Sequence, residues 1–291
     1  MTGFQDRFPI GHGGRYLHFP HLTRKVPTVN PLRSLIFAIA GNDTIRHFVS
    51  TVPGSRSLGR RFVAGETGTE AVATVQRLAD EGLCSTLDRL DVPGDRAGAE
   101  RAVQEYLRVL DAVHADGISE CVEIGVALAA VGGAFDEKLA LDNLWRICAA
   151  AEQCATEVTL DADLAVVAEL RRTWPAAGAV LRASDPGVEA QAAALAFSGS
   201  RVRLTTGAPS HQADLAYVRC VNILLAGDGH PIFATADRRL LEIIAERALW
   251  HGRKQGEYEF QLPNGVRSDE QLALAQDGET VRVHVPFGGH L

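Results

Sequence analysis

Two charged residues stand at the ends of β-rich runs, where side chains of opposite charge could do chemistry. Asp161 closes the run 157–161, and Arg182 lies near the end of the run 179–183. A carboxylate in such a place can take a proton from a bound molecule, and a fixed guanidinium attracts an anionic group. The two residues could therefore support a deprotonation or a cyclisation, with Asp161 as the base and Arg182 as the anion holder.

Structural roles are the alternatives for the same residues. Asp161 can be satisfied by backbone amides or by Arg203, and Arg203 can form a buried ion pair with Asp161 or Glu259. Arg182 can be a solvated residue at the rim of a site. Both interpretations stay open from the residues alone.

Histidines and cysteines give weaker signals. His12, His18 and His21 lie close together, but no carboxylate or cysteine stands at a ligand spacing, so no metal site is expected. The five cysteines are odd in number and widely spaced, which predicts neither a disulfide framework nor a zinc site. Cys84 and Cys121, near predicted strand starts, are interpreted as small core residues rather than nucleophiles.

The elements that must position these residues alternate between short β-rich runs and helical segments. This alternation is typical of βαβ units, because a parallel strand needs a long crossover, and eight units favour a (β/α)8 TIM-like barrel over an open sheet. Catalytic side chains of such a barrel lie at the carboxyl ends of the strands. The predicted strands are Cys84–Leu90, Cys121–Leu128, Glu157–Asp161, Ala179–Ala183, Val202–Thr205, Pro231–Thr235, Glu257–Leu262 and Val281–Val285.

The predicted organisation has two parts. Residues 1–60 form an irregular N-terminal arm with a short helix around 35–40, and residues 61–291 form the barrel. The chain stops at Leu291, so no final barrel helix is expected after the last strand.

From about Arg61 to Gly288 the sequence resembles the proline dehydrogenases, FAD enzymes built on a (β/α)8 barrel. The segments that carry the resemblance are 61–67, 86–88, 159–163, 202–208, 258–261 and 281–288. The resemblance implies that Asp161 lies beside the substrate and the flavin, and that Arg203 contacts the flavin. It also implies cofactor contacts for Gly207 and Ala208, which permit a close backbone approach, and for Thr235.

The sequence departs from this family where the family does its chemistry. Ala127 stands where a lysine is expected beside Asp161, and Arg182 replaces a neutral amide. The family's final helix supplies two arginines that clamp the substrate carboxylate, and here Arg182 is the obvious candidate for a new partner. The other departures are Thr206, Ala236, Pro209 and the segment 263–265.

Composition narrows the function classes. A net charge of -7 and a pI near 5.8 argue against a protein that follows a phosphate backbone. The apolar run at 35–40 is too short to span a bilayer, and the unpaired cysteines fit a reducing compartment, so a cytoplasmic location is expected.

Three hypotheses follow. The first is an FAD-dependent oxidoreductase acting on a cyclic or secondary amine other than free proline, including a carrier-bound one. The second is a barrel that has lost its flavin and is either a pseudoenzyme or a biosynthetic enzyme with different chemistry, using Asp161 and Arg182. The third is a subunit whose open barrel end is covered by a partner chain or by a second copy of itself.

Overall fold

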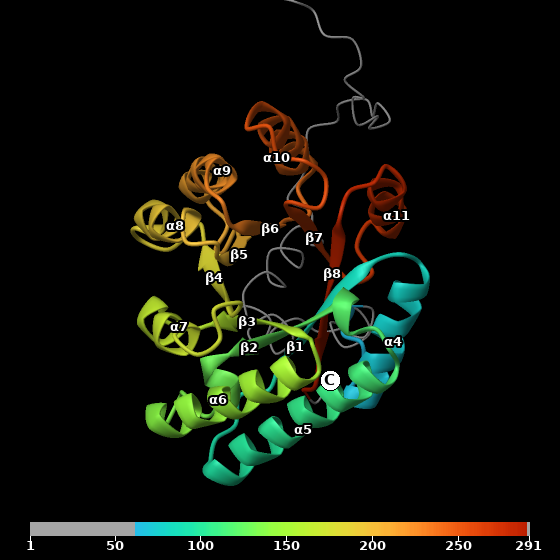
Figure 1. Ribbon diagram of the computed structural model, residues 1–291, viewed down its shortest axis with the longest axis vertical. Helices are drawn as coiled ribbons and strands as arrows, with labels where there is room; N and C mark the ends of the chain where they lie inside the picture. The colour runs from blue at the N-terminus through green and yellow to red at the C-terminus, as the bar shows by residue number, and fades with distance from the viewer. Residues whose placement is uncertain (1–61, 290–291) are drawn as a thin grey trace, which may run out of the picture.

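The computed structural model describes residues 62–289, and in them eight parallel strands close into a barrel surrounded by helices (Figure 1). Each strand pairs with the next along the chain, and β8 pairs with β1 to complete the ring. The predicted (β/α)8 barrel is therefore confirmed. The strands are β1 (Cys84–Arg89), β2 (Val122–Ala127), β3 (Glu157–Asp161), β4 (Gly178–Arg182), β5 (Arg201–Thr205), β6 (His230–Ala234), β7 (Glu259–Pro263) and β8 (Val281–Phe287).

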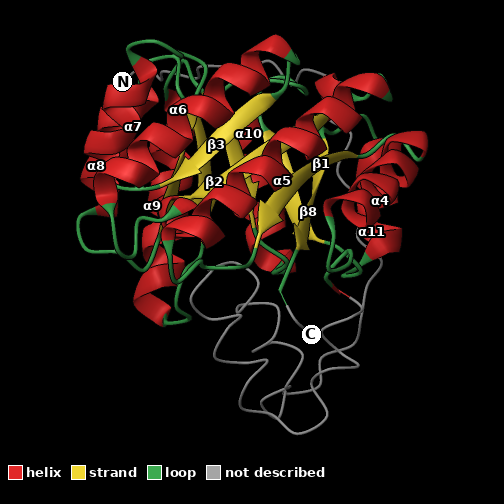
Figure 2. Cartoon of the chain, turned by 90° about the horizontal axis from the view of Figure 1, so that it is seen from below, coloured by secondary structure: helices red, strands yellow, loops and turns green. Residues whose placement is uncertain are grey.

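The helices connect successive strands and enclose the barrel, as the side view in Figure 2 shows. Their apolar faces pack on the outer surface of the sheet; in α10, for example, Leu240, Ile244 and Ala248 are buried as their spacing predicts. The described helices are α4 (Gly68–Asp80), α5 (Arg96–Ala115), α6 (Glu137–Gln153), α7 (Leu164–Arg171), α8 (Val188–Ala196), α9 (His211–Ala226), α10 (Arg238–Trp250) and α11 (Ser268–Gln276).

Strand boundaries agree with the predicted ones to within two residues. The largest shift at a strand start is at β7, which begins at Glu259 rather than Glu257. Glu257 belongs to a turn, because its backbone N–H donates to the carbonyl of Lys254 and its carboxylate accepts from the Lys254 N–H. A turn that satisfies these groups locally ends the strand pattern there.

Helix α4 closes the outer ring between the last strand and the first. It begins with a capping box, in which Thr67 and Glu70 satisfy each other's backbone N–H groups, and it packs against both β1 and β8. In Figure 1 it lies between α11 and α5. The outside of the seam between β8 and β1 is thus covered by α4, a helix that precedes the barrel strands in the sequence.

Phe287, at the end of β8, is buried rather than part of an exposed apolar rim. It is 1% exposed and packs edge-on against Tyr106 of α5, with the ring centroids 6.2 Å apart. The apolar, uncapped barrel end that would favour a partner chain is therefore not found at this residue.

The barrel separates two kinds of core. Aliphatic residues fill the layer between the sheet and the helices, whereas many inward positions of the strands carry charged side chains. Barrels of this class usually fill the interior with branched aliphatic residues. The interior of this barrel is thus an unusual place for charge.

The N-terminal arm, its short helix and the three histidines at 12, 18 and 21 lie outside the described residues. Among residues 62–289, no cluster of metal-ligating side chains is found. In the same range, each helix is too short or too polar to cross a lipid bilayer.

Candidate active site

Asp161 and Arg182 meet at the carboxyl ends of neighbouring strands β3 and β4. A guanidinium nitrogen of Arg182 forms an ion pair with Asp161 Oδ2, and the two side chains keep 29% and 20% of their surface exposed. Both were predicted as candidate site residues, from their places at strand ends and from the family resemblance, and the structure brings them together. The anion holder of the sequence analysis is therefore engaged by the chain's own carboxylate.

The charge partner of Asp161 comes from β4 and not from β2. Ala127, at the end of β2, is the direct Cα partner of Asp161, so a lysine at that position would reach the carboxylate from the other side. Arg182 fills the role from the next strand along the barrel. Asp161 thus receives its cation from β4, while its neighbour on β2 is a small apolar residue.

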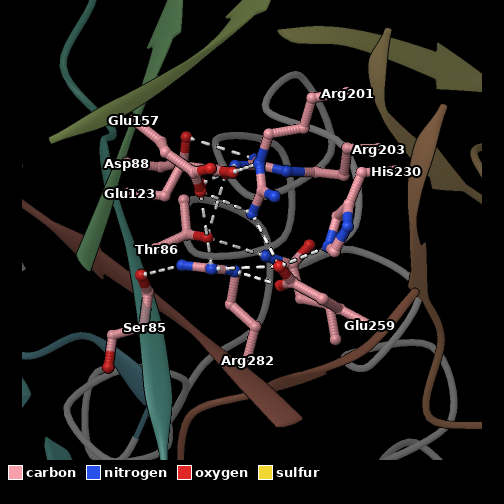
Figure 3. Close-up of polar contacts among 11 residues, drawn as sticks. Ser85, Thr86, Asp88, Glu123, Glu157, Arg201, Arg203, His230, Glu259 and Arg282 are labelled. Atoms are coloured by element: carbon pink, nitrogen blue, oxygen red, sulfur yellow. Dashed lines mark hydrogen bonds and ion pairs between the residues drawn. The ribbon is translucent and has the colours of Figure 1, made fainter. Parts of the chain in front are cut away.

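Arg203 points into the barrel from β5 and is held by two carboxylates (Figure 3). Its guanidinium donates to Asp88 Oδ2 of β1 at 3.1 Å and forms an ion pair with Glu123 of β2. A buried ion pair was one of the expected alternatives, but the expected partners, Asp161 and Glu259, were wrong. The strands β1 and β2 lie across the barrel axis from β5, and the inward side chains reach over that gap.

The electrostatics of these three groups favour their charged forms. Burial is the largest single influence and disfavours ionisation of Asp88 and Glu123. Arg203 and His284 at Asp88, and Arg203, Arg201 and Arg282 at Glu123, together still hold the pKa of each carboxyl below its usual range. Burial likewise opposes the charge on Arg203, and the carboxylates of Asp88 and Glu123 still raise the pKa of Arg203. His284 of β8 adds a 2.6 Å contact to Asp88 Oδ2.

A second layer of charge continues toward the starts of the strands (Figure 3). Arg201 bridges Glu123 at 2.7 Å and Glu259 at 2.9 Å, and Arg282 donates to Glu259 at 2.5 Å and to the carbonyl of Ser85 at 2.8 Å. Although burial opposes ionisation of Glu259, Arg282 holds the pKa of this carboxyl well below its usual range. We call Asp88, Glu123, Glu259, Arg201, Arg203 and Arg282 the interior network.

Gly125 makes space for this network. A Cβ atom built on Gly125 would overlap the carboxylate of Asp88. A side chain at this position of β2 would therefore displace Asp88 from Arg203.

Gly207 and Ala208 lie in the loop that follows β5. Gly207 has a φ of +66°, in the left-handed region, and a Cβ at this position would overlap the hydroxyl of Ser184 and lie 3.3 Å from Arg182 Cβ. The lack of a side chain at Gly207 thus lets the β5 loop pack against the residues that follow β4. Ala208 is exposed.

Thr235 follows β6 and is 7% exposed. Its hydroxyl accepts a hydrogen bond from the backbone N–H of Asp237 at 3.1 Å, next to the start of α10. The hydroxyl proton is left to donate to another group. Thr235 and the pair Asp161–Arg182 are at the same end of the barrel, but no contact joins them.

Sequence reasoning did not single out Glu123, Arg201 or Arg282 as members of a cluster. A signal for them was present, because charged or amide residues recur at every second position of several strands, as in Arg201 and Arg203. Alternate residues of a strand share one face, so this period places such residues on one side of the sheet. The period alone does not favour a polar interior, because the interior of a barrel is expected to be apolar.

One buried atom among the residues that the resemblance assigns to FAD, the Nε of Arg203, is suited to bind that cofactor. Arg203 Nε is buried and has no hydrogen-bond partner among the described residues, so it is a donor that still needs an acceptor. Arg203 carries the positive charge that suits the electron-rich edge of a flavin, and the loop after β5 becomes exposed at Ala208, next to the buried Gly207. Arg203, Gly207, Ala208 and Thr235 are therefore the residues that would hold the cofactor.

Comparison with known proteins gives relatives of one kind. No protein-family model matches the chain. The proline dehydrogenase of Deinococcus radiodurans is 30% identical over 256 residues, which cover 80% of this chain and 82% of that protein. Proline dehydrogenase 1 of Bacillus subtilis (strain 168) is 26% identical over 276 residues, with 88% and 90% of the two chains covered.

Solved structures show the same fold. Proline utilization A (PutA) from Bdellovibrio bacteriovorus, inactivated by N-propargylglycine, superimposes with a TM-score of 0.72 at 17% identity over 88% of this chain. A mutant of Bradyrhizobium japonicum PutA gives 0.66 at 22% identity over 80%. The chain spans about a third of those longer proteins, 35% and 29%. From the relative that shares 30% of its residues over four fifths of the sequence, the chain belongs to the proline dehydrogenase family.

Proposed function

We propose that this chain is an FAD-dependent oxidoreductase that acts on a cyclic or secondary amine other than free proline. Family membership supports the oxidoreductase class and FAD. The observation that carries the substrate class is the ion pair between Arg182 and Asp161 at the carboxyl ends of β3 and β4. Arg182 was the obvious candidate to receive a substrate carboxylate, and it is engaged by the chain's own carboxylate.

A free amino acid would have to compete for this pair. Its carboxylate would need to displace Asp161 from Arg182, which leaves Asp161 without that partner in a site where only 20% of its side chain meets solvent. Separating a partly buried ion pair costs free energy that a neutral substrate does not spend. An amine whose carboxyl group is esterified, amidated, attached to a carrier or absent avoids this cost.

Asp161 would bind the nitrogen end of such a substrate. A protonated amine is attracted to a carboxylate, and the same carboxylate can hold a proton that the nitrogen releases. Arg182 fixes the orientation of Asp161 through their ion pair. When bound, FAD supplies the acceptor for the hydride that leaves the carbon next to the amine nitrogen.

The proposed partners are therefore a small-molecule amine or a carrier-bound substrate. A second chain over the barrel end is a further proposal, which light scattering on the purified protein tests. A dimer or a larger assembly would support it, and a monomer at all concentrations would contradict it.

An absorbance spectrum of the purified full chain is the first test of the function. We expect a flavin band at near-stoichiometric content, with FAD released on denaturation. A colourless protein that fails to take up added FAD would exclude the oxidoreductase and leave a flavin-free barrel using Asp161 and Arg182.

The substrate class is tested by anaerobic bleaching of the flavin band. The compounds are proline, proline amide, a proline ester and pyrrolidine, which share the ring and differ in the carboxyl group. We expect the three compounds without a free carboxylate to bleach the band faster than proline. Faster bleaching by proline would contradict the proposed substrate while leaving the oxidoreductase intact.

A further inference from the structure

Two of the five cysteines lie side by side at the end of the barrel opposite the candidate active site. Cys84 is the first residue of β1, and Cys121 ends the short 3-10 turn Ser119–Cys121 that leads into β2. The pairing of Ser85 with Val122 places the preceding residues, Cys84 and Cys121, next to each other across the two strands. They are neighbours in space although a whole helix, α5, separates them along the chain.

The two cysteines lie at the floor of the barrel. Cys84 stands two residues before Thr86, and Cys121 stands two residues before Glu123. The Thr86 hydroxyl bonds to Glu123 in the barrel interior at 3.2 Å, and alternate residues of a strand share a face. The Cys84 thiol therefore belongs to the inner face, at the floor of the barrel, and Cys121 lies beside it where the chain enters β2.

The thiols are within reach of one another. Cys121 is one of the groups that raise the pKa of the Cys84 thiol, after burial, which is the largest cause, so the two thiols are near enough to act on each other. Neighbouring strands lie about 4.8 Å apart, inside the range of Cα separations, roughly 4.4–6.8 Å, that a disulfide bridges. Both cysteines are free in the structure.

Solvent reaches this pair and not the other cysteines. Cys84 and Cys121 are partly exposed, whereas Cys148, Cys154 and Cys220 are buried. Burial raises the pKa of the Cys148 thiol to about 12, so its thiolate form is scarce at neutral pH, and burial also shields Cys154 and Cys220 from a disulfide in solution. The expectation that Cys84 and Cys121 are core residues was therefore wrong.

We propose that Cys84 and Cys121 are a redox-sensitive dithiol that closes to an intrachain disulfide when the protein meets a low-molecular-weight disulfide. The site does not depend on the amine oxidoreductase function. In a reducing compartment such a pair stays reduced and closes when the thiol pool is oxidised.

The exchange balances in two steps. Cys121 attacks one sulfur of the small disulfide, forms a mixed disulfide and releases one thiol. Cys84 then attacks the sulfur of Cys121, closes the protein disulfide and releases the second thiol. The two protons from the cysteines pass to the two leaving thiolates, so the small disulfide gains two electrons and the pair loses two. The same balance holds if Cys84 attacks first and Cys121 closes the disulfide.

Closure would join β1 to β2 at their starts and enclose α5 in a covalent loop. Such a cross-link restricts the unfolded chain, so the oxidised protein should melt at a higher temperature than the reduced one. The effect would be felt at the floor of the barrel, beside Arg282, whose charge acts on Cys84.

Peptide mapping of the full chain tests the proposal. The protein is incubated with oxidised glutathione, its remaining thiols are alkylated, and it is digested without reduction for mass spectrometry. We expect one cross-linked peptide that joins Cys84 to Cys121, a fall in titratable thiols from five to three, and reversal by dithiothreitol. A Cys154→Ser variant is the matched control, because it removes a buried thiol and should keep the cross-link.

Other results would overturn the proposal. Glutathione that accumulates as a stable mixed disulfide on Cys84 or Cys121 in the wild-type protein, without the cross-linked peptide, would show that the pair does not close. A cross-link to Cys148, Cys154 or Cys220, or no reaction under conditions that oxidise a small dithiol, would also contradict it. The wild-type map decides these cases even where a Cys84→Ser variant folds poorly.

Discussion

The interior network and the Asp161–Arg182 pair use the same types of residue under different conditions. The side chains of Glu123 and Arg203 are 0% and 7% exposed, whereas those of Asp161 and Arg182 are 20% and 29% exposed. In the interior, Glu123 forms ion pairs with two arginines, and Arg203 forms ion pairs with two carboxylates. If one residue of the interior network is replaced, its former partners keep a buried charge that nothing compensates. If Asp161 or Arg182 is replaced, the residue that remains can still be solvated by water.

This difference assigns different work to the two regions. Buried charges that satisfy each other fix the positions of five strands, β1, β2, β5, β7 and β8, around the barrel axis. Among the described residues, Asp161 and Arg182 at the strand ends contact fewer charged partners, and their side chains are more exposed to solvent. The pair is therefore available to a ligand. The interior network should therefore control stability and the pair should control chemistry.

Replacing Glu123 with Ala is the largest expected perturbation. Arg201 and Arg203 would each lose a carboxylate in the buried interior, and breaking a buried ion pair on one side costs roughly 3–5 kcal/mol of unfolding free energy. Urea denaturation followed by circular dichroism measures the loss. Glu189→Ala is the control, because its partner Arg219 is 56% exposed and the exposed pair contributes below about 1 kcal/mol. Equal losses in the two variants would remove the distinction between interior and surface charge.

The second largest expected effect is a loss of stability at low pH, caused by protonation of the carboxylates of the interior network. Asp88, Glu123 and Glu259 have pKa values lowered by the surrounding arginines. A carboxyl whose pKa is lower in the folded state contributes stability that is present above its unfolded pKa, about 4, and is lost as the pH falls through the folded pKa. We expect the unfolding free energy to be steady from pH 7 to 5 and to fall by about 2–3 kcal/mol or more below pH 4.

Denaturant curves at several pH values test this expectation. A Glu259→Gln variant should show a shallower fall, because one of the three carboxyls no longer titrates. A wild-type stability that stays constant between pH 5 and 3 would show that these groups keep ordinary pKa values.

Gly207→Ala probes the region of the pair rather than the interior. The new methyl group would overlap the Ser184 hydroxyl and would also place alanine at a φ of +66°. We expect a loss of about 2 kcal/mol in thermal or urea unfolding. Gly252→Ala is a matched control with a φ of +71° and no atom within 4 Å of the new methyl, so it should cost about 1 kcal/mol from conformation alone. Equal losses of unfolding free energy in the two variants would mean that the loop after β5 moves away from Ser184 without an energetic cost.

The strand pattern of this chain could be predicted from its sequence, because each strand is a local run of β-forming residues between turns. The ends of β3 and β4 could also be predicted, and with them the importance of Asp161 and Arg182. That these two residues pair was not predicted. It depends on how far the Arg182 side chain reaches across from the next strand, which a single run does not reveal.

The partners of Arg203 could not be predicted for a related reason. Asp88 and Glu123 stand 115 and 80 residues before Arg203 in the sequence, and they meet it only because the barrel closes. Contacts across the axis depend on strand tilt and on side-chain length together. The covering of β8 and β1 by α4 was missed as well, because an amphipathic helix shows that it has an apolar face and not which strands that face covers.

Asp161→Asn gives the smallest expected change in stability and the sharpest test of the comparison. The side chain keeps its shape and loses its charge, and because both partners are partly exposed the unfolding free energy should fall by no more than about 1 kcal/mol. The amine-dependent bleaching rate should fall on the order of 100-fold, since the group that binds the nitrogen has lost its charge. Asp88→Asn is the same exchange within the interior network, and it should cost more stability than Asp161→Asn because the charge of Arg203 is left with less compensation. The double variant Ala127→Lys/Arg182→Gln tests whether Asp161 needs its cation to come from β4. Position 127 of β2 is the direct strand partner of Asp161. A lysine there should therefore restore the stability that the single variant Arg182→Gln loses. If Asp161→Asn instead destabilised the protein as much as Asp88→Asn and left the bleaching rate unchanged, the pair would belong to the scaffold and the chemistry would have to be sought elsewhere in the barrel.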